Sequence, residues 1–233
     1  MSTVIKNNNI MSYPCKIFNI SLNKTATKST ATLLAKCGIR SVHSVESPFV
    51  HIDKFDAFSD CVHLEPPQSK YNQSGGFKKY YESYPNSLFL LNVRPVQDWI
   101  YSRFKHCSAN LQNNQTTNWG YPPTEKLALN WISLRRNYHR EVLDFFKDKP
   151  SQLLVCNINN PDWQKNTLKF LQIDKKVSFI EKNRRSIDVV EPSMFGKITE
   201  VVKSLNNHVD YDKDELLFPN FDPTNYSKLQ ILL

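Results

Sequence analysis

The residues best suited to chemistry lie at positions 24–30, which read KTATKST. This stretch holds two lysines and four hydroxyl side chains, groups that bind phosphate or sulfate oxygens. It directly precedes a helical pattern at residues 31–37, so the backbone amides of a helix N-terminus would point to the same place. The pattern predicts a cradle for a phosphate-like anion, although Ser and Thr at this position also serve as ordinary helix caps.

A second group with similar chemistry is Arg94, with Ser102 eight residues later. Arg94 follows residues 87–93 (SLFLLNV), the clearest apolar strand in the chain, and Ser102 falls on the helical pattern after it. A guanidinium at a strand end and a hydroxyl on the next helix can hold one phosphate together. The same arginine would also fit a surface charge or a structural ion pair.

The elements that must position these groups alternate between strands and helices. Apolar runs typical of buried parallel strands occur at residues 15–22, 39–43, 87–93 and 152–158. Helical periodicity occurs at residues 31–37, 77–84, 96–107, 124–149, 162–171 and 194–205. A further buried strand is expected around residues 61–64, after a short helix or turn that begins near Phe55.

This alternation predicts an α/β fold, a three-layer sandwich around a mainly parallel central sheet. In such a sheet, ligands bind beyond the carboxyl ends of the strands. Both anion-binding groups follow strands directly, so we expect both at that edge.

The composition fits one globular domain with an anionic partner. The chain has 233 residues, of which 40% are hydrophobic and 22% charged, with a formal net charge of +8. These values exclude collagen-like, disordered and disulfide-scaffold proteins. We expect a single domain over residues 1–233, with residues 1–13 flexible and residues 210–233 irregular. The charge favours a nucleotide, phosphate or sulfate, and without a dense Lys/Arg run we expect no nucleic acid.

The sequence also suggests a compartment. No run of about 18 apolar residues occurs, so no membrane span is expected. Residues 1–11 lack the apolar core of a secretory signal. The five cysteines are scattered and odd in number, which favours reduced thiols. We therefore expect a cytoplasmic protein, whose oligomeric state the sequence leaves open.

Together, the two anion-binding groups resemble those of the sulfotransferases that use 3'-phosphoadenosine-5'-phosphosulfate (PAPS). That family has a Lys-Ser/Thr-Gly-Thr-Thr-like loop after its first strand, which holds the 5'-phosphosulfate. It also has an Arg and a Ser, separated by seven residues, which hold the 3'-phosphate. The matching segments here are KTAT at residues 24–27 and RPVQDWIYS at residues 94–102, and the resemblance runs in order from Lys16 to Ile173.

The resemblance implies a P-loop NTPase-like sulfotransferase fold and in-line transfer of a sulfuryl group, with no metal. The acceptor would be a hydroxyl or amine on a small molecule, glycan or peptide, and the product 3'-phosphoadenosine-5'-phosphate (PAP). Lys24 would stabilise the leaving oxygen. The donor's 5' side would be bound by Lys24, Thr25, Ala26, Thr27, Lys28, Ser29 and Thr30. Its 3'-phosphate would be bound by Arg94 and Ser102, with Arg184 or Arg185 over it.

An acceptor hydroxyl also needs a general base within hydrogen-bonding reach. The candidates are His63 and Asp60 in the segment SDCVHLEP, and then His43 and Glu46 after the second predicted strand. We rank His63 first, Asp60 second and Glu46 third. A half-buried structural histidine would explain His63 as well as a catalytic role does.

One residue departs from the family, because Ala26 stands where the family's loop has a glycine. If that position requires a positive φ, the alanine is strained. A catalytically silent nucleotide-binding module of the same fold is therefore one alternative.

A P-loop nucleotide kinase or phosphotransferase is the other alternative. It would use Lys28 and Ser29 and hold Mg²⁺ with an aspartate at a strand end. The ATP-binding pattern Gly-x-x-x-x-Gly-Lys-Ser/Thr would need glycines at Leu22 and Thr27, and neither position has one. We also expect no apolar strand that ends cleanly in Asp.

Overall fold

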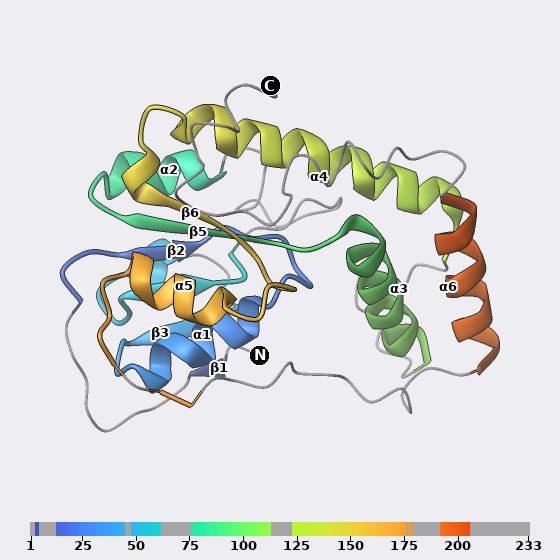
Figure 1. Ribbon diagram of the computed structural model, residues 1–233, viewed down its shortest axis with the longest axis horizontal. Coiled ribbons are helices and arrows are strands. Elements are labelled where there is room, and N and C mark those ends of the chain that lie inside the picture. Colours follow the sequence, from blue (N-terminus) through green and yellow to red (C-terminus); the bar gives the residue numbers. More distant parts are fainter. Residues whose placement is uncertain are drawn as a thin grey trace. The chain divides into compact units, whose positions relative to one another are not determined.

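The computed structural model describes residues 3–4, 13–44, 48–61, 76–112, 123–175, 177–178 and 192–205. Its strands are β1 (Thr3–Val4), β2 (Ile17–Asn19), β3 (Ser41–His43), β4 (Ala57–Ser59), β5 (Leu88–Val93) and β6 (Leu153–Asn157). Its helices are α1 (Thr27–Lys36), α2 (Gly76–Ser83), α3 (Val96–Gln112), α4 (Glu125–Phe146), α5 (Trp163–Phe170) and α6 (Pro192–Ser204), with short 3-10 turns η1 (Pro48–His51) and η2 (Pro150–Gln152) (Figure 1).

The strands form one sheet in the order β1-β3-β4-β2-β5-β6. Strands β2 to β6 pair in parallel, and β1 pairs antiparallel with β3. This confirms the predicted α/β class with a mainly parallel sheet. From β2 the chain runs through α1 to β3, which lies on one side of β2 in the strand order. From β5 the chain runs to β6, which lies in the opposite direction. The strand order therefore reverses between β2 and β5, and such a switch point is where open parallel sheets bind ligands.

Helices cover both faces of the sheet, because successive strand residues point to opposite sides. On one face, Ile17 packs in a core cluster with Leu34 of α1 and Trp163 of α5. On the other face, the ring of Phe18 stacks on Tyr80 of α2 with centroids 4.8 Å apart, and the aromatic end of α4 packs beside it. Figure 1 shows α1 and α5 on one side of the sheet and α2 on the other. The arrangement is compatible with the predicted three-layer sandwich.

Helix α1 begins at Thr27, earlier than the start predicted at Ala31. The predicted end is confirmed, since Gly38 has a φ of 89° and its amide donates to the Ala35 carbonyl at 2.9 Å. Glycine adopts this left-handed conformation without steric cost, which closes the helix. The earlier start places much of the predicted anion-binding stretch in the first turn of a helix.

The helix or turn predicted from Phe55 is wrong, because a strand lies there. Instead of a helix or turn followed by a strand at residues 61–64, the structure has the strand at Ala57–Ser59, and residues 62–64 lie outside the described residues. The segment becomes a strand because it lies between β3 and β2, which satisfy its backbone hydrogen bonds on both sides. As a result, Asp60 directly follows a strand at the carboxyl edge of the sheet.

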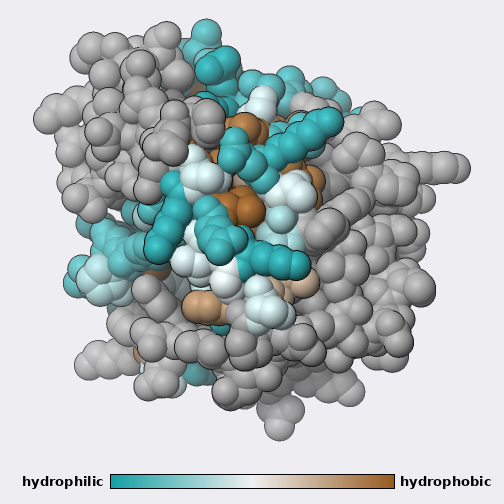
Figure 2. Space-filling view, turned by 90° about the vertical axis from the view of Figure 1, so that its right-hand side faces the viewer, coloured by the Kyte–Doolittle hydropathy of each residue, from teal (hydrophilic) through white to brown (hydrophobic). Residues whose placement is uncertain are grey.

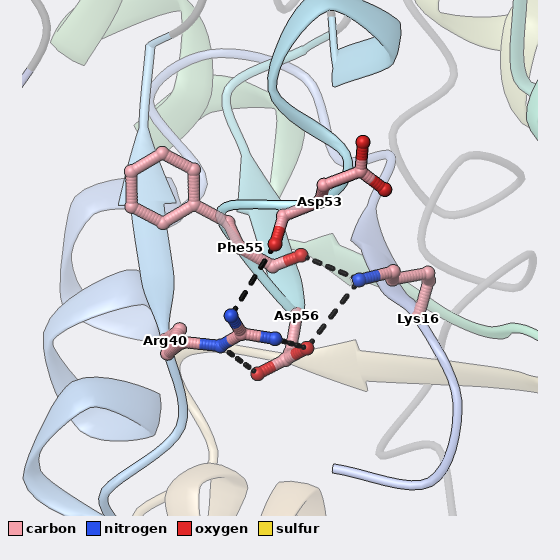
Figure 3. A network of polar contacts seen from close by, with 5 residues as sticks. All are labelled: Lys16, Arg40, Asp53, Phe55 and Asp56. Atoms are coloured by element: carbon pink, nitrogen blue, oxygen red, sulfur yellow. Dashed lines mark hydrogen bonds and ion pairs between the residues drawn. The ribbon is translucent and has the colours of Figure 1, made fainter. Parts of the chain in front are cut away.

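A charged network joins the starts of three neighbouring strands at the opposite, amino-terminal edge (Figure 3). Asp56, which is 2% exposed, accepts hydrogen bonds of 2.8 Å from both Nε and Nη2 of Arg40. Lys16 Nζ lies 3.4 Å from the same carboxylate and donates to the Phe55 carbonyl at 2.8 Å. Arg40 Nη1 also donates to the Asp53 carbonyl at 3.3 Å. Burial alone would raise the pKa of Asp56, but Arg40 and Lys16 together lower it.

The chain clusters into two compact units. The first comprises residues 1–93, 141–183 and 220–233, and the second comprises residues 94–140 and 184–219. The first holds the sheet. In the second, Phe104 of α3 packs against Trp131 of α4 at 4.9 Å, and Tyr101 meets Phe195 of α6 edge-on at 5.9 Å. The single domain expected over residues 1–233 stays a prediction.

The described surface is mixed in hydropathy. On the face in Figure 2, hydrophilic side chains lie beside smaller hydrophobic patches. Among the described residues, Phe49 is the large hydrophobic side chain that stands exposed, at 39%. None of the helices in the described ranges has the length and apolar character needed to cross a membrane.

Candidate functional site

The loop between β2 and α1 carries the predicted anion cradle at the carboxyl end of the central strand. Lys24 and Ala26 both have left-handed backbones, with φ of 65° and 62°. For residues other than glycine this conformation costs about 1–2 kcal/mol. Ala26 is therefore strained, as we expected if this position required a positive φ. The surrounding contacts must hold the loop in this shape.

Two of the loop hydroxyls hold that shape. Thr25 Oγ1 donates to the Leu22 carbonyl at 2.5 Å, and Thr30 Oγ1 donates to the Ala26 carbonyl at 3.1 Å. Both threonines are buried, at 3% and 0% exposure. Their hydroxyls are thus bonded within the loop and the first helical turn, and their predicted contact with phosphate stays a prediction.

The N-terminus of α1 is open to an anion. The first amides of a helix have no acceptor within the helix, and here Ala26 supplies no side-chain cap. The first turn contains no acidic residue, while Lys28 is exposed on it and Lys24 is half-buried just before it. Amides, the positive end of the helix dipole and two ammonium groups therefore lie on one segment.

A buried polar network supports the loop from below. Asn92 Nδ2 donates to Thr30 Oγ1 at 2.8 Å, and the Asn92 amide donates to Ser21 Oγ at 2.5 Å. Ser21 Oγ in turn donates to Asn19 Oδ1. All four residues are at most 1% exposed. The network links β2 and β5 across the switch point and ties both to the first turn of α1.

This network was not among the predictions made from the sequence. A signal for it was present, because Asn19 and Asn92 interrupt two apolar strand runs. Asparagines on buried strands need hydrogen-bond partners inside the protein. Two such residues, each just before a predicted anion-binding group, indicate a polar site between the strands.

A second cluster lies beside the loop, at the ends of β3 and β4. Thr27 Oγ1 lies 3.2 Å from His43 Nε2, and Asp60 Oδ2 lies 3.7 Å from the same nitrogen. Ser59 Oγ donates to the Thr27 carbonyl at 2.8 Å. The structure thus brings Asp60, one of the ranked bases, next to His43, a candidate that we named but did not rank.

This cluster is not a hydrolytic triad. In a triad the nucleophile's hydroxyl and the carboxylate bind opposite nitrogens of the imidazole. Here Thr27 and Asp60 both approach Nε2 of His43. The geometry instead places the imidazole as a polar neighbour of the first residue of α1.

Four further predicted residues lie outside the described residues. They are Glu46, His63, Arg184 and Arg185. Our ranking of the general base therefore stays a prediction, as does the covering role of the paired arginines.

Arg94 directly follows β5 and belongs to the second unit. Its Nη2 lies 3.9 Å from Asp98 Oδ2, and its carbonyl accepts a hydrogen bond of 3.0 Å from Arg135 Nη2. Burial lowers the pKa of Arg94 while Asp98 opposes that shift, and a guanidinium stays charged at neutral pH. Ser102 is half-buried on α3. The predicted contact of Arg94 and Ser102 with a 3'-phosphate stays a prediction.

Two buried tryptophans hold the arginines beside this position. The guanidinium carbon of Arg103 lies 4.9 Å from the Trp99 ring and 4.1 Å from the Trp131 ring. That of Arg135 lies 5.7 Å from the Trp99 ring. Both tryptophans are 2% exposed, so they belong to a core. Stacking restricts the guanidinium of Arg135, which in turn holds the Arg94 backbone.

Within the described ranges, no group of three or more His, Cys, Asp or Glu side chains is arranged to hold a metal ion. A scan against protein-family models and a search of curated proteins both find no match for this chain. The function is therefore inferred from the geometry and chemistry of the site.

Proposed function

We propose that the chain is a PAPS-dependent sulfotransferase of the P-loop type, which transfers a sulfuryl group to an acceptor hydroxyl or amine. The observation that carries this proposal is the strained loop at Lys24 and Ala26, with the uncapped end of α1, at the switch point between β2 and β5. Ligands of open parallel sheets bind at such a point, and the amides at a helix N-terminus favour an anion.

The second anion-binding group supports a donor with phosphates at two ends. Arg94 directly follows β5, and β5 is the strand paired with β2 on this side of the sheet. PAPS carries a 5'-phosphosulfate and a separate 3'-phosphate, which suits the two anion-binding groups predicted from the sequence. ATP carries its phosphates in one chain and requires one cradle.

The proposed step is an in-line displacement at sulfur. The acceptor oxygen forms a bond to sulfur, the bond from sulfur to the bridging oxygen breaks, and PAP leaves. Negative charge builds on the bridging oxygen, where the ammonium of Lys24 stabilises it. The acceptor proton goes to a base, for which His63, Asp60 and Glu46 are the ranked proposals.

Ligand binding and turnover test the proposal. PAP should raise the melting temperature more than ATP with Mg²⁺ does. Arg94→Ala should lose that preference, while Arg140→Ala, at an exposed arginine on α4 in the same unit, should keep it. Labelled PAPS with a panel of acceptors then separates an enzyme from a silent binding module, which would bind PAP without turnover.

One observation favours a nucleotide kinase as a second candidate. Asp60 directly follows β4, the other neighbour of β2, so this edge has the strand-end aspartate that the sequence analysis did not find. Such a carboxylate could hold Mg²⁺ beside ATP. In this case ATP with Mg²⁺ should bind better than PAP, and Asp60→Asn should abolish the dependence on Mg²⁺.

A further inference from the structure

His43 is the imidazole closest to the anion loop among the described contacts. It ends β3, and its Nε2 lies 3.2 Å from the hydroxyl of Thr27, the first residue of α1. Thr27 is 6% exposed, and its carbonyl is held by Ser59. The Thr27 hydroxyl oxygen is therefore held in place, and only the direction of its proton can change.

The protonation state of Nε2 decides where that proton points. When Nε2 carries no proton it can only accept, so the Thr27 hydroxyl donates to it. When Nε2 is protonated it donates to Thr27 Oγ1, and the Thr27 proton is then available to another acceptor. The imidazolium also adds one positive charge beside the end of α1 that already favours an anion.

We propose that His43 is a residue of the donor-binding site, which binds the 5'-phosphosulfate more tightly when it is protonated. The inference rests on the proposed function and adds to it a residue that positions Thr27. Among the described residues, the charged groups on the segments next to His43 are Asp60 after β4, and Lys24 and Lys28 on the loop and first turn. The described residues of β1, which pairs with His43 at Thr3, carry no charged side chain. The Asp60 carboxylate lies 3.7 Å from His43 Nε2, within ion-pair distance of a protonated imidazole.

The test is the affinity for PAP by calorimetry from about pH 5.5 to pH 8, the range in which histidines change charge. Wild type, His43→Gln and His51→Gln are compared. His51 lies on η1 and packs edge-on against Phe55 at 6.4 Å, so it is a histidine control away from the loop. The phosphates of PAP titrate in the same way with all three proteins. Dividing the dissociation constant of each variant by that of wild type at the same pH therefore cancels the contribution of the phosphates.

We expect His43→Gln to bind PAP about fivefold more weakly than wild type at the acid end, the effect of one charge near the ligand. At pH 8 the two proteins should bind almost equally, and His51→Gln should follow wild type throughout. A ratio that stays constant with pH would overturn the inference. Absence of PAP binding by wild type at every pH would instead count against the proposed function.

Asp60→Asn provides a second measurement should His43→Gln fail to fold. Removing the carboxylate disfavours the imidazolium, so the pH at which PAP binding tightens should move to lower values. An unchanged pH profile in Asp60→Asn would also contradict the role of His43, because the two groups would then not be coupled.

Discussion

The two edges of the sheet differ in where they hold strain and charge. At the amino-terminal edge, Asp56 accepts hydrogen bonds from Arg40 and pairs with Lys16, so the charges are compensated within the chain. At the carboxyl edge, Lys24 and Ala26 adopt left-handed backbones. Ser44 after β3 and Asp60 after β4 do so too, each with a φ of 61°. Of the five described non-glycine residues with positive φ, four therefore lie at this edge.

The difference separates a structural device from a candidate binding site. The ion network around Asp56 joins the starts of three strands and stabilises the fold. Backbone strain persists only where the surroundings enforce it, and it clusters at functional sites. The carboxyl edge also has a helix end with neither a side-chain cap nor an acidic first turn. We therefore expect changes at this edge to affect binding, and changes at the other edge to affect stability.

The largest effect is expected from Lys24→Ala. Loss of a group that stabilises charge in the transition state lowers turnover about 10²–10³-fold. The melting temperature should change little, because a half-buried lysine on a loop contributes little to stability. Lys36→Ala, on the exposed last turn of the same helix, is the control and should keep full turnover. Unchanged turnover of labelled PAPS in Lys24→Ala would show that the proposed mechanism is wrong.

Asp56→Asn should affect stability instead. The variant loses charged hydrogen bonds at a buried site, which lowers the free energy of unfolding by about 2–3 kcal/mol. Affinity for PAP should stay within about twofold, since the site is at the other edge. Denaturant unfolding and calorimetry measure the two quantities, and a selective loss of PAP binding would contradict the comparison.

The network around Asp56 also predicts that the free energy of unfolding depends on pH. Because the pKa of Asp56 is lowered in the folded protein, its contribution is complete above the unfolded value of about 3.9. The contribution is lost as the pH falls through the lower, folded value. The stability difference between wild type and Asp56→Asn should therefore shrink below about pH 4.

Thr30→Val should destabilise the carboxyl edge by a smaller amount. It keeps the shape of the side chain but leaves the buried Asn92 amide without this acceptor, at a cost of about 1–2 kcal/mol. The network is neutral, so this loss should not vary with pH, unlike that of Asp56→Asn. Thr32→Val is the control, two residues further along the same helix. It removes the hydrogen bond from the Thr32 hydroxyl to the Lys28 carbonyl at the surface, and should change the free energy of unfolding by less than about 0.5 kcal/mol.

Ala26→Gly should have the smallest effect, and the opposite sign. Glycine relieves the left-handed strain, so the free energy of unfolding should rise by about 0.5–1 kcal/mol, with PAP affinity kept or improved. Ala31→Gly, in the interior of α1, should lower the free energy of unfolding by about 1 kcal/mol. Destabilisation by both substitutions would show that Ala26 is not strained.

Local patterns were enough to predict the alternation of strands and helices and the segment before α1. An apolar run, a polar loop and a helical period are properties of neighbouring residues, and Gly38 marks the end of α1 by its own conformational freedom. The resemblance to the sulfotransferase pattern rests on the same kind of local information. Its implications for donor and acceptor stay proposals.

Only the tertiary structure decided which strands are neighbours. The segment at β4 has no clear pattern of its own and becomes a strand because β2 and β3 bond to it on both sides. That pairing brings His43 next to Thr27, 16 residues away in the chain, and Asp60 next to His43. The pairing of β5 with β2 brings Asn92 next to Thr30, 62 residues away. Contacts of this kind depend on strand order and register, which arise from burial of the whole sheet and not from any one segment.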